Sequence, residues 1–188
     1  MGKAALLIID MQNDFVLEGK PLKVAGAPAV IPKIRAVLAE FRKRSLPVIH
    51  VLRVHRADGS DVEIIRKELF GRQPFAVAGT AGAAVIDELA PMNGEVVLEK
   101  TRMSAFIGTE LDLVLRTLGV STLFVCGIQT PNCIRTTVFD GIAYNYQVVL
   151  IDDATGAASD EIHRANVQDM QNIGVRIVKA AEIPGIFG

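Results

Sequence analysis

Short runs of apolar residues recur along the chain, and each is about as long as a β-strand. The runs are rich in β-branched residues and do not alternate with polar ones, which is typical of parallel strands covered by helices on both faces. The predicted strands are residues 4–9, 48–54, 96–98, 123–126, 148–151 and 175–178.

Between these runs, apolar residues recur at helical spacing, one turn apart on a single face. Alternating strands and helices predict an α/β fold, a three-layer α/β/α sandwich with a doubly wound parallel sheet of about six strands. We expect residues 1–188 to form a single domain. The clearest helical sets are Val30, Ile34, Val37, Leu38 and Phe41, and Leu111, Val114, Leu115 and Leu118.

Residues typical of helix ends support these boundaries. Thr109 with Asp112 resembles a capping box, and Gly119 follows as a stop. Ser159 is placed to begin a later helix that Gly174 ends. Residues 53–94 interrupt the alternation of predicted strands and helices, because they contain turn residues and a run of small side chains. We expect a lid or substrate loop there.

Composition narrows the class of protein. The 188 residues are 50% apolar and 22% charged, which suits a folded globular domain. A formal charge of −1 gives no basic face for nucleic acid or an anionic membrane, so we expect neither partner. No hydrophobic leader opens the chain, and its two cysteines form no C-x-x-C pair, so we expect a cytoplasmic protein.

Three chemically distinct side chains end or follow predicted strands. Asp10 ends the first run, Lys100 ends the third, and Cys133 opens the helix after the fourth. In doubly wound sheets the ligand crevice lies outside the carboxyl ends of the strands, so these groups are expected at one edge. If Thr130 is the N-cap and Pro131 is the first helical residue, Cys133 lies in the first helical turn. The helix dipole there is expected to lower the thiol pKa, and free N–H groups to hold an oxyanion.

Each of these residues also has an ordinary structural interpretation. A cysteine in a helix is often a small buried hydrophobe, and we take that interpretation for Cys126 inside a strand. An aspartate often caps a turn, and a lysine at a strand end is often solvated. The three histidines are poorly placed to serve a thiol, which favours an aspartate base assisted by a lysine.

Three motifs in register resemble the isochorismatase-like cysteine hydrolase superfamily, which includes nicotinamidases and N-carbamoylsarcosine amidases. The motifs are residues 10–15 (DMQNDF), 99–106 (EKTRMSAF) and 127–137 (GIQTPNCIRTT). The resemblance implies a catalytic triad of Asp10, Lys100 and Cys133 and a cis peptide between Ile128 and Gln129. It also implies an oxyanion hole from the backbone N–H groups of Gln129 and Cys133. Substrate contacts are expected from residues in or beside these motifs and the second strand, namely Phe15, Arg53, His55, Arg102 and Ile128.

The position of Lys100 presents a geometric difficulty. The resemblance implies the strand order 3-2-1-4-5-6, which separates the first and third strands by roughly 9 to 10 Å at ~4.8 Å per strand. The residues alone favour the third strand between the first and the fourth. We nevertheless expect the Lys100 ammonium within ion-pair distance of Asp10, because an aspartate beside a thiolate needs a nearby cation.

A departure from the nicotinamidase pattern bears on metal binding. Nicotinamidases carry Asp-x-His after the second strand as part of a metal site, whereas this chain reads Arg53-Val54-His55. His55 and Asp58 are too few for a metal site, so we predict no metal and no cofactor. Arg53 and Arg102 are placed instead to bind a substrate carboxylate or ureido oxygen.

The function that follows is hydrolysis of the C–N bond of a small amide or carbamoyl substrate through a covalent thioester. Isochorismatases proper lack the nucleophilic cysteine, whereas this chain has Cys133. The chain is therefore similar to the amide hydrolases of the superfamily. One alternative is a nicotinamidase with an altered metal site. The other is a non-catalytic redox-responsive protein that uses Cys133 as a sensor thiol. Relatives often assemble, so we expect a homo-oligomer.

Overall fold

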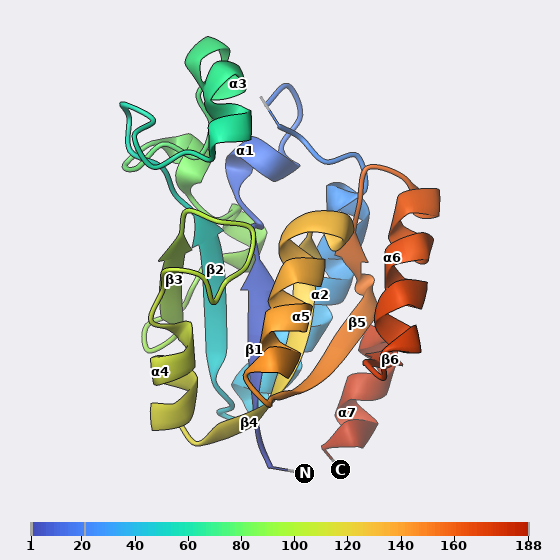
Figure 1. Cartoon of the computed structure of the whole chain (residues 1–188). Coiled ribbons are helices and arrows are strands. Elements are labelled where there is room, and N and C mark those ends of the chain that lie inside the picture. Colours follow the sequence, from blue (N-terminus) through green and yellow to red (C-terminus); the bar gives the residue numbers. More distant parts are fainter. Residues whose placement is uncertain (1, 21, 188) are drawn as a thin grey trace.

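The protein, seen in a computed structural model that describes residues 2–20 and 22–187, is built around one six-stranded parallel sheet (Figure 1). The strand order is β3-β2-β1-β4-β5-β6, so the order implied by the resemblance is confirmed and the placement of the third strand between the first and fourth is wrong. The strands are β1 Lys3–Ile9, β2 Val48–Arg53, β3 Val96–Lys100, β4 Val120–Ile128, β5 Gln147–Gly156 and β6 Arg176–Val178.

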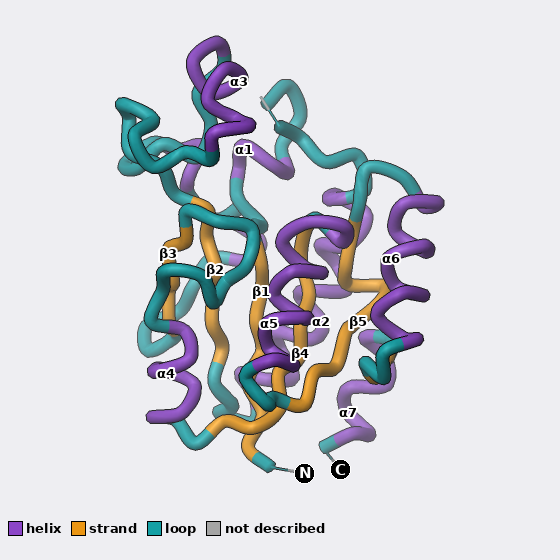
Figure 2. Tube along the Cα trace, viewed as in Figure 1, coloured by secondary structure: helices purple, strands orange, loops and turns teal. Residues whose placement is uncertain are grey.

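Helices cover both faces of the sheet and give the predicted three layers (Figure 2). One buried cluster joins Phe41 of α2 and Ile183 of α7 to Phe124 of β4. The other joins α4, α5 and α6 to the opposite face. The α-helices are α1 Asn13–Val16, α2 Ala27–Lys43, α3 Lys67–Arg72, α4 Leu111–Thr117, α5 Arg135–Ala143, α6 Asp160–Asn172 and α7 Ile183–Ile186. Shorter turns are η1 Ile64–Arg66, η2 Ala81–Ala83, η3 Asp87–Leu89, η4 Thr130–Ile134 and η5 Ala180–Glu182.

The predicted elements are all present, with one error in their burial. Ser159 begins α6, and its hydroxyl accepts a hydrogen bond from the N–H of Ile162 at 3.3 Å. Gly174 follows that helix with φ 98°. On β3, however, Val97 and Glu99 are exposed, so the expectation that every strand is covered on both faces is wrong. The reason is that β3 is an edge strand of the sheet.

A glycine at the end of β4 allows two strand ends to meet. Gly127 has φ 110°, and a Cβ atom there would lie 2.2 Å from the carbonyl oxygen of Ile9. Any larger residue at this position would therefore push β4 away from β1. The next peptide bond, between Ile128 and Gln129, is cis. The glycine thus allows the end of β4 to lie close against the end of β1.

The segment from 53 to 94 covers the carboxyl edge of the sheet with its first part, and its last residues, 92–94, line a hollow with Lys3 and Pro47 at the opposite edge. It contains η1, α3, η2 and η3, and Figure 1 shows α3 standing above the ends of the central strands. This is the place expected for a lid or substrate loop. Within the described residues, no helix has the length and apolar character needed to cross a membrane.

Candidate active site

A cavity of about 280 Å³ opens at the carboxyl edge of the sheet, below α3. Its wall combines a mainly apolar surface with a few polar groups, which is typical of a site for a small organic ligand. Asp10, Gln129 and Cys133 meet in this wall. The remaining lining residues are Phe15, Leu22, Val24, Arg53, Arg66, Leu69, Ile128 and Asn132.

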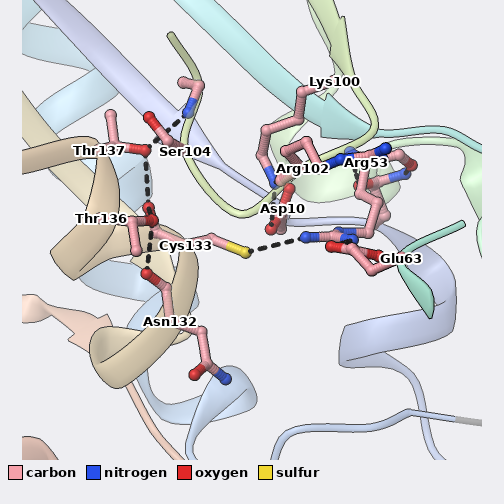
Figure 3. Close-up of polar contacts among 12 residues, drawn as sticks. Asp10, Arg53, Glu63, Lys100, Arg102, Ser104, Asn132, Cys133, Thr136 and Thr137 are labelled. Carbon is pink, nitrogen blue, oxygen red and sulfur yellow. Dashed lines mark hydrogen bonds and ion pairs between the residues drawn. The ribbon is translucent and has the colours of Figure 1, made fainter. Parts of the chain in front are cut away.

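Asp10 and Lys100 form a buried ion pair behind this cavity. The Lys100 ammonium donates to Oδ2 of Asp10 at 3.0 Å, and the two side chains are 0% and 6% exposed. Lys100 also donates to the carbonyl oxygen of Arg102 at 3.2 Å, so the loop after β3 helps to hold it (Figure 3). The lysine side chain reaches past the end of β2, which lies between β1 and β3. The expected ion-pair distance is therefore found despite the strand separation.

One of the two carboxylate oxygens of Asp10 has no partner among the described residues. Asp10 has φ 55°, in the left-handed region, and its N–H donates to the carbonyl oxygen of Val51 at 2.8 Å. Lys100 occupies Oδ2, while Oδ1 is buried and has no hydrogen-bond partner among the described residues. A buried acceptor with no partner is costly unless another molecule uses it. Oδ1 is thus placed to accept a proton.

Cys133 lies in η4, a single π-helical turn that leads into α5. The backbone position before this turn is occupied by Gln129, and the expectation that Thr130 is the N-cap is wrong. The Thr130 hydroxyl instead lies 2.9 Å from Nδ1 of His163 on α6. The Cys133 carbonyl accepts a hydrogen bond from the Thr137 hydroxyl at 2.7 Å. The turn that carries Cys133 is thus held by one contact with α6 and one with α5.

The environment of the thiol favours its protonated form. Burial raises the pKa of Cys133, and the neighbouring Asp10 carboxylate raises it further, while Lys100 and Arg53 oppose this effect. The expectation of a lowered thiol pKa is therefore wrong, because the site buries the sulfur more completely than its place at a helix start indicates. A protonated thiol needs a base before it can attack, and Asp10 is the carboxylate beside it.

Arg53 is the second cation at this sulfur. Its guanidinium lies 3.8 Å from Sγ of Cys133 and donates to Oε1 of Glu63 at 2.7 Å (Figure 3). Burial alone lowers the pKa of Arg53, but the negative charges of Cys133, Asp10 and Glu63 outweigh it and raise that pKa. The guanidinium is therefore charged at any physiological pH and stabilises a thiolate when one forms.

Two residues predicted to contact substrate lie outside the cavity wall, whereas Phe15, Arg53 and Ile128 line it. Nδ1 of His55 lies 3.3 Å from Oδ1 of Asp61, and the ring is fully buried among phenylalanines. Burial, followed by the charge of Arg53, lowers the pKa of His55. Arg102 donates to the carbonyl oxygens of Asp61 and Thr101. Both side chains thus contact Asp61 of the lid segment and not the cavity.

The two cysteines lie on opposite faces of the sheet. Cys126 packs in the cluster with α2, and its sulfur is 3.6 Å from the carbonyl oxygen of Leu7. Cys133 packs in the cluster with α4, α5 and α6. Burial raises the pKa of Cys126 as well, and no charged group opposes it. Cys126 is therefore a buried core residue, as its position inside a strand indicates.

Comparison with known proteins identifies the relatives of this arrangement. The family model of the isochorismatase domain matches residues 4–182. This chain belongs to the isochorismatase family. It is 46% identical to a probable inactive nicotinamidase of Arabidopsis thaliana over 92% of this chain and 90% of the relative. It is 32% identical to a maleamate amidohydrolase of Pseudomonas putida, over 90% and 80% respectively.

The solved structures give the same result. An isochorismatase family protein from Desulfovibrio vulgaris is 46% identical to this chain and superimposes with a TM-score of 0.96. The superposition covers 100% of this chain and 99% of the other. The protein is thus a hydrolase of the isochorismatase family.

The residues of this isochorismatase-family hydrolase do not fit a metal ion in the place where nicotinamidases have one. Among the described residues, no three His, Cys, Asp or Glu side chains gather closely enough to hold a metal. The guanidinium of Arg53 stands near His55 instead, and a fixed positive charge disfavours a nearby cation.

Three residues of this family member were not foreseen from its sequence. Arg66 and Leu69 line the cavity from η1 and α3, and only the general expectation of a lid over residues 53–94 pointed to them. His163 binds the Thr130 hydroxyl through Nδ1 and Oδ1 of Asp152 through Nε2, at 2.9 and 2.8 Å. Its helical periodicity gave no sign of this contact, because the partners come from β5 and η4.

Proposed function

We propose that this protein is a cysteine-dependent hydrolase that cleaves the C–N bond of a small amide or carbamoyl substrate through a covalent thioester. The observation that carries the proposal is the convergence of a thiol and a lysine-paired carboxylate on one small cavity. Asp10, Lys100 and Cys133 form the catalytic triad in this proposal. The names of relatives such as the maleamate amidohydrolase support amide hydrolysis.

In the first half of the reaction, Oδ1 of Asp10 accepts the proton of the Cys133 thiol as the sulfur attacks the substrate carbonyl carbon. The carbonyl oxygen becomes an oxyanion, which the backbone N–H groups of Gln129 and Cys133 bind. Asp10 then gives the proton to the nitrogen, the C–N bond breaks, and the amine or ammonia leaves. The product of this half is a thioester on Cys133.

In the second half, water attacks the thioester carbonyl and Asp10 takes its proton. The C–S bond then breaks, the carboxylic or carbamic acid leaves, and the thiolate regains a proton from Asp10. Lys100 and Arg53 stabilise the negative charge that alternates between Asp10 and the sulfur. Because burial raises the pKa of the Cys133 thiol, attack depends on Asp10 rather than on a standing thiolate.

The two other functions have less support. A nicotinamidase with an altered metal site lacks a fitting donor set, and the related plant protein is itself named a probable inactive nicotinamidase. A redox sensor needs a resolving thiol, yet Cys126 lies on the opposite face of the sheet from Cys133.

The test is turnover by the purified protein against a panel of primary amides, ureas and carbamoyl amines, with nicotinamide included. We expect ammonia release from at least one compound, and an acyl adduct on Cys133 by mass spectrometry of the quenched enzyme. Cys133→Ala should lose both, while the matched variant Cys126→Ala keeps both. Reversible oxidation of Cys133 under mild peroxide with no turnover of any compound would favour the redox sensor instead. Turnover of nicotinamide that needs added metal would favour the altered nicotinamidase.

A further inference from the structure

The charges around the cavity do not balance. Asp10 is paired with Lys100 at 3.0 Å, and Arg53 with Glu63 at 2.7 Å. Each pair cancels its own formal charge, and the resting thiol adds none. One lining residue, Arg66, remains as a net positive charge.

Arg66 has no carboxylate partner within the described part of the chain. No acidic side chain there comes within the 4.0 Å that defines an ion pair, although the neighbouring residues Glu68 and Arg72 of α3 pair with each other. The side chain of Arg66 is half-buried at the junction of η1 and α3. A partly buried guanidinium is stabilised by an anionic partner. Burial raises the pKa of Glu63, and Arg53 above all, with Arg66 in addition, lowers it, but the hydrogen bond of this carboxylate goes to Arg53 and not to Arg66.

The other two arginines near the site already have partners. The Arg53 guanidinium is held between Glu63 and the sulfur of Cys133. Arg102 donates to two backbone carbonyl oxygens and does not line the cavity. Arg66 is therefore the arginine of this site whose guanidinium is available to a ligand.

The size of the cavity limits what this ligand is. About 280 Å³ is near the lower end of the usual range of ligand pockets, ~300–1,000 Å³. A molecule that fills this space with its carbonyl carbon at Cys133 brings its far end against the remaining wall. Away from the thiol, that wall contains apolar side chains, among them Leu22 and Leu69, and the polar residues Asn132 and Arg66, of which only Arg66 is charged.

We propose that Arg66 is a specificity-determining residue that pairs with a carboxylate on the substrate, so that the preferred substrates are short-chain amides or ureides bearing one carboxylate. The apolar wall packs against the carbon skeleton between the two ends. This proposal rests on the proposed function, because it names the substrate class of the same site.

Succinamate and succinamide make a matched pair of probes, since a carboxylate in one replaces a carboxamide in the other. Succinamide has two equivalent amide groups, so kcat/KM is compared per amide group. On this basis we expect the wild-type enzyme to prefer succinamate. Arg66→Met should lower kcat/KM for succinamate by about 10- to 100-fold, mostly through KM, and leave succinamide nearly unchanged. Arg66→Lys should restore part of the loss. Arg72→Met, a change of the exposed arginine at the end of the adjacent helix α3, should leave both substrates unaffected.

A preference of the wild type for succinamide, or an equal loss on both probes in Arg66→Met, would overturn the role of Arg66. If neither probe is hydrolysed, binding to the Cys133→Ala variant by calorimetry decides the question. Binding of succinamate that Arg66→Met abolishes would support the carboxylate site even with the proposed reaction in doubt. Absence of binding, or binding that does not depend on Arg66, would overturn it.

Discussion

Replacing Lys100 with methionine removes the ammonium of the buried ion pair and keeps most of the side-chain volume. The lost contact joins Lys100 Nζ to Oδ2 of Asp10 at 3.0 Å. At an effective dielectric constant of about 20, this distance corresponds to an attraction of roughly 5 kcal/mol, and desolvation of the ammonium offsets part of it. Breaking a buried pair typically costs ~3–5 kcal/mol, because one charge stays unpaired. Arg53 also acts on Asp10, so we expect a loss near the lower end, ~3 kcal/mol.

Urea unfolding followed by circular dichroism measures this loss. The double variant Asp10→Asn with Lys100→Met carries no unpaired charge, so it should regain at least half of the lost free energy of unfolding. A single variant within ~1 kcal/mol of the wild type would refute the reasoning from charge. So would a double variant that is no more stable than the single one.

The same substitution tests the role of Lys100 in the reaction. We expect kcat to fall by at least ~100-fold with a much smaller change in KM, because the charge matters most while the proton moves. Lys100 lowers the pKa of the Cys133 thiol, so its removal should raise that pKa. The pH dependence of iodoacetamide labelling measures the shift. Unchanged kcat would reduce the triad to an Asp–Cys pair.

Three further outcomes are expected. Iodoacetamide should label Cys133 in the folded protein much faster than Cys126, by peptide mass mapping, because only Cys133 lines the cavity; faster labelling of Cys126 would reverse the assignment. Gly127→Ala should lower the free energy of unfolding by several kcal/mol, roughly 3 or more, since its Cβ would meet the backbone of β1 at 2.2 Å; Gly185→Ala, with open space around it, is the control. Burial alone raises the pKa of Glu95, but Arg42 and other donors outweigh this and lower it from 4.5 to about 2. Glu95→Gln should therefore cost roughly 1–3 kcal/mol at neutral pH, with the difference from wild type lost as pH falls from 4.5 towards 2, and an equal difference at pH 2 would contradict this.

The hydrophobic pattern was sufficient for the elements but not for their order in space. Each apolar run became a strand, and Ser159 and Gly174 bound a helix as expected. A strand buried on both faces gives no information about which strand lies beside it, so the pattern alone put β3 in the wrong place. The correct strand order was predicted only from the resemblance of the three motifs to the family.

At the site, sequence position predicted which residues meet but not how their surroundings tune them. Asp10 and Lys100 follow from polar residues that end apolar runs. The raised pKa of Cys133 depends on burial by several elements and is not visible in a helix start. Arg66 lines the cavity together with residues far away along the chain, and His163 contacts Thr130 across the fold. Neither residue stands in a periodic pattern that marks such a position.

The Arg53–Glu63 ion pair connects the segment that surrounds the substrate with the segment that performs the chemistry. Glu63 belongs to the lid, directly before η1, whereas Arg53 ends β2 beside the sulfur of Cys133. A lid exchanged between relatives to obtain a new specificity would bring new cavity walls but would also remove the partner of a buried guanidinium. In this protein, substrate range and nucleophile electrostatics are not separate modules, and a transplanted lid must carry a carboxylate at position 63 to leave the thiol as it was.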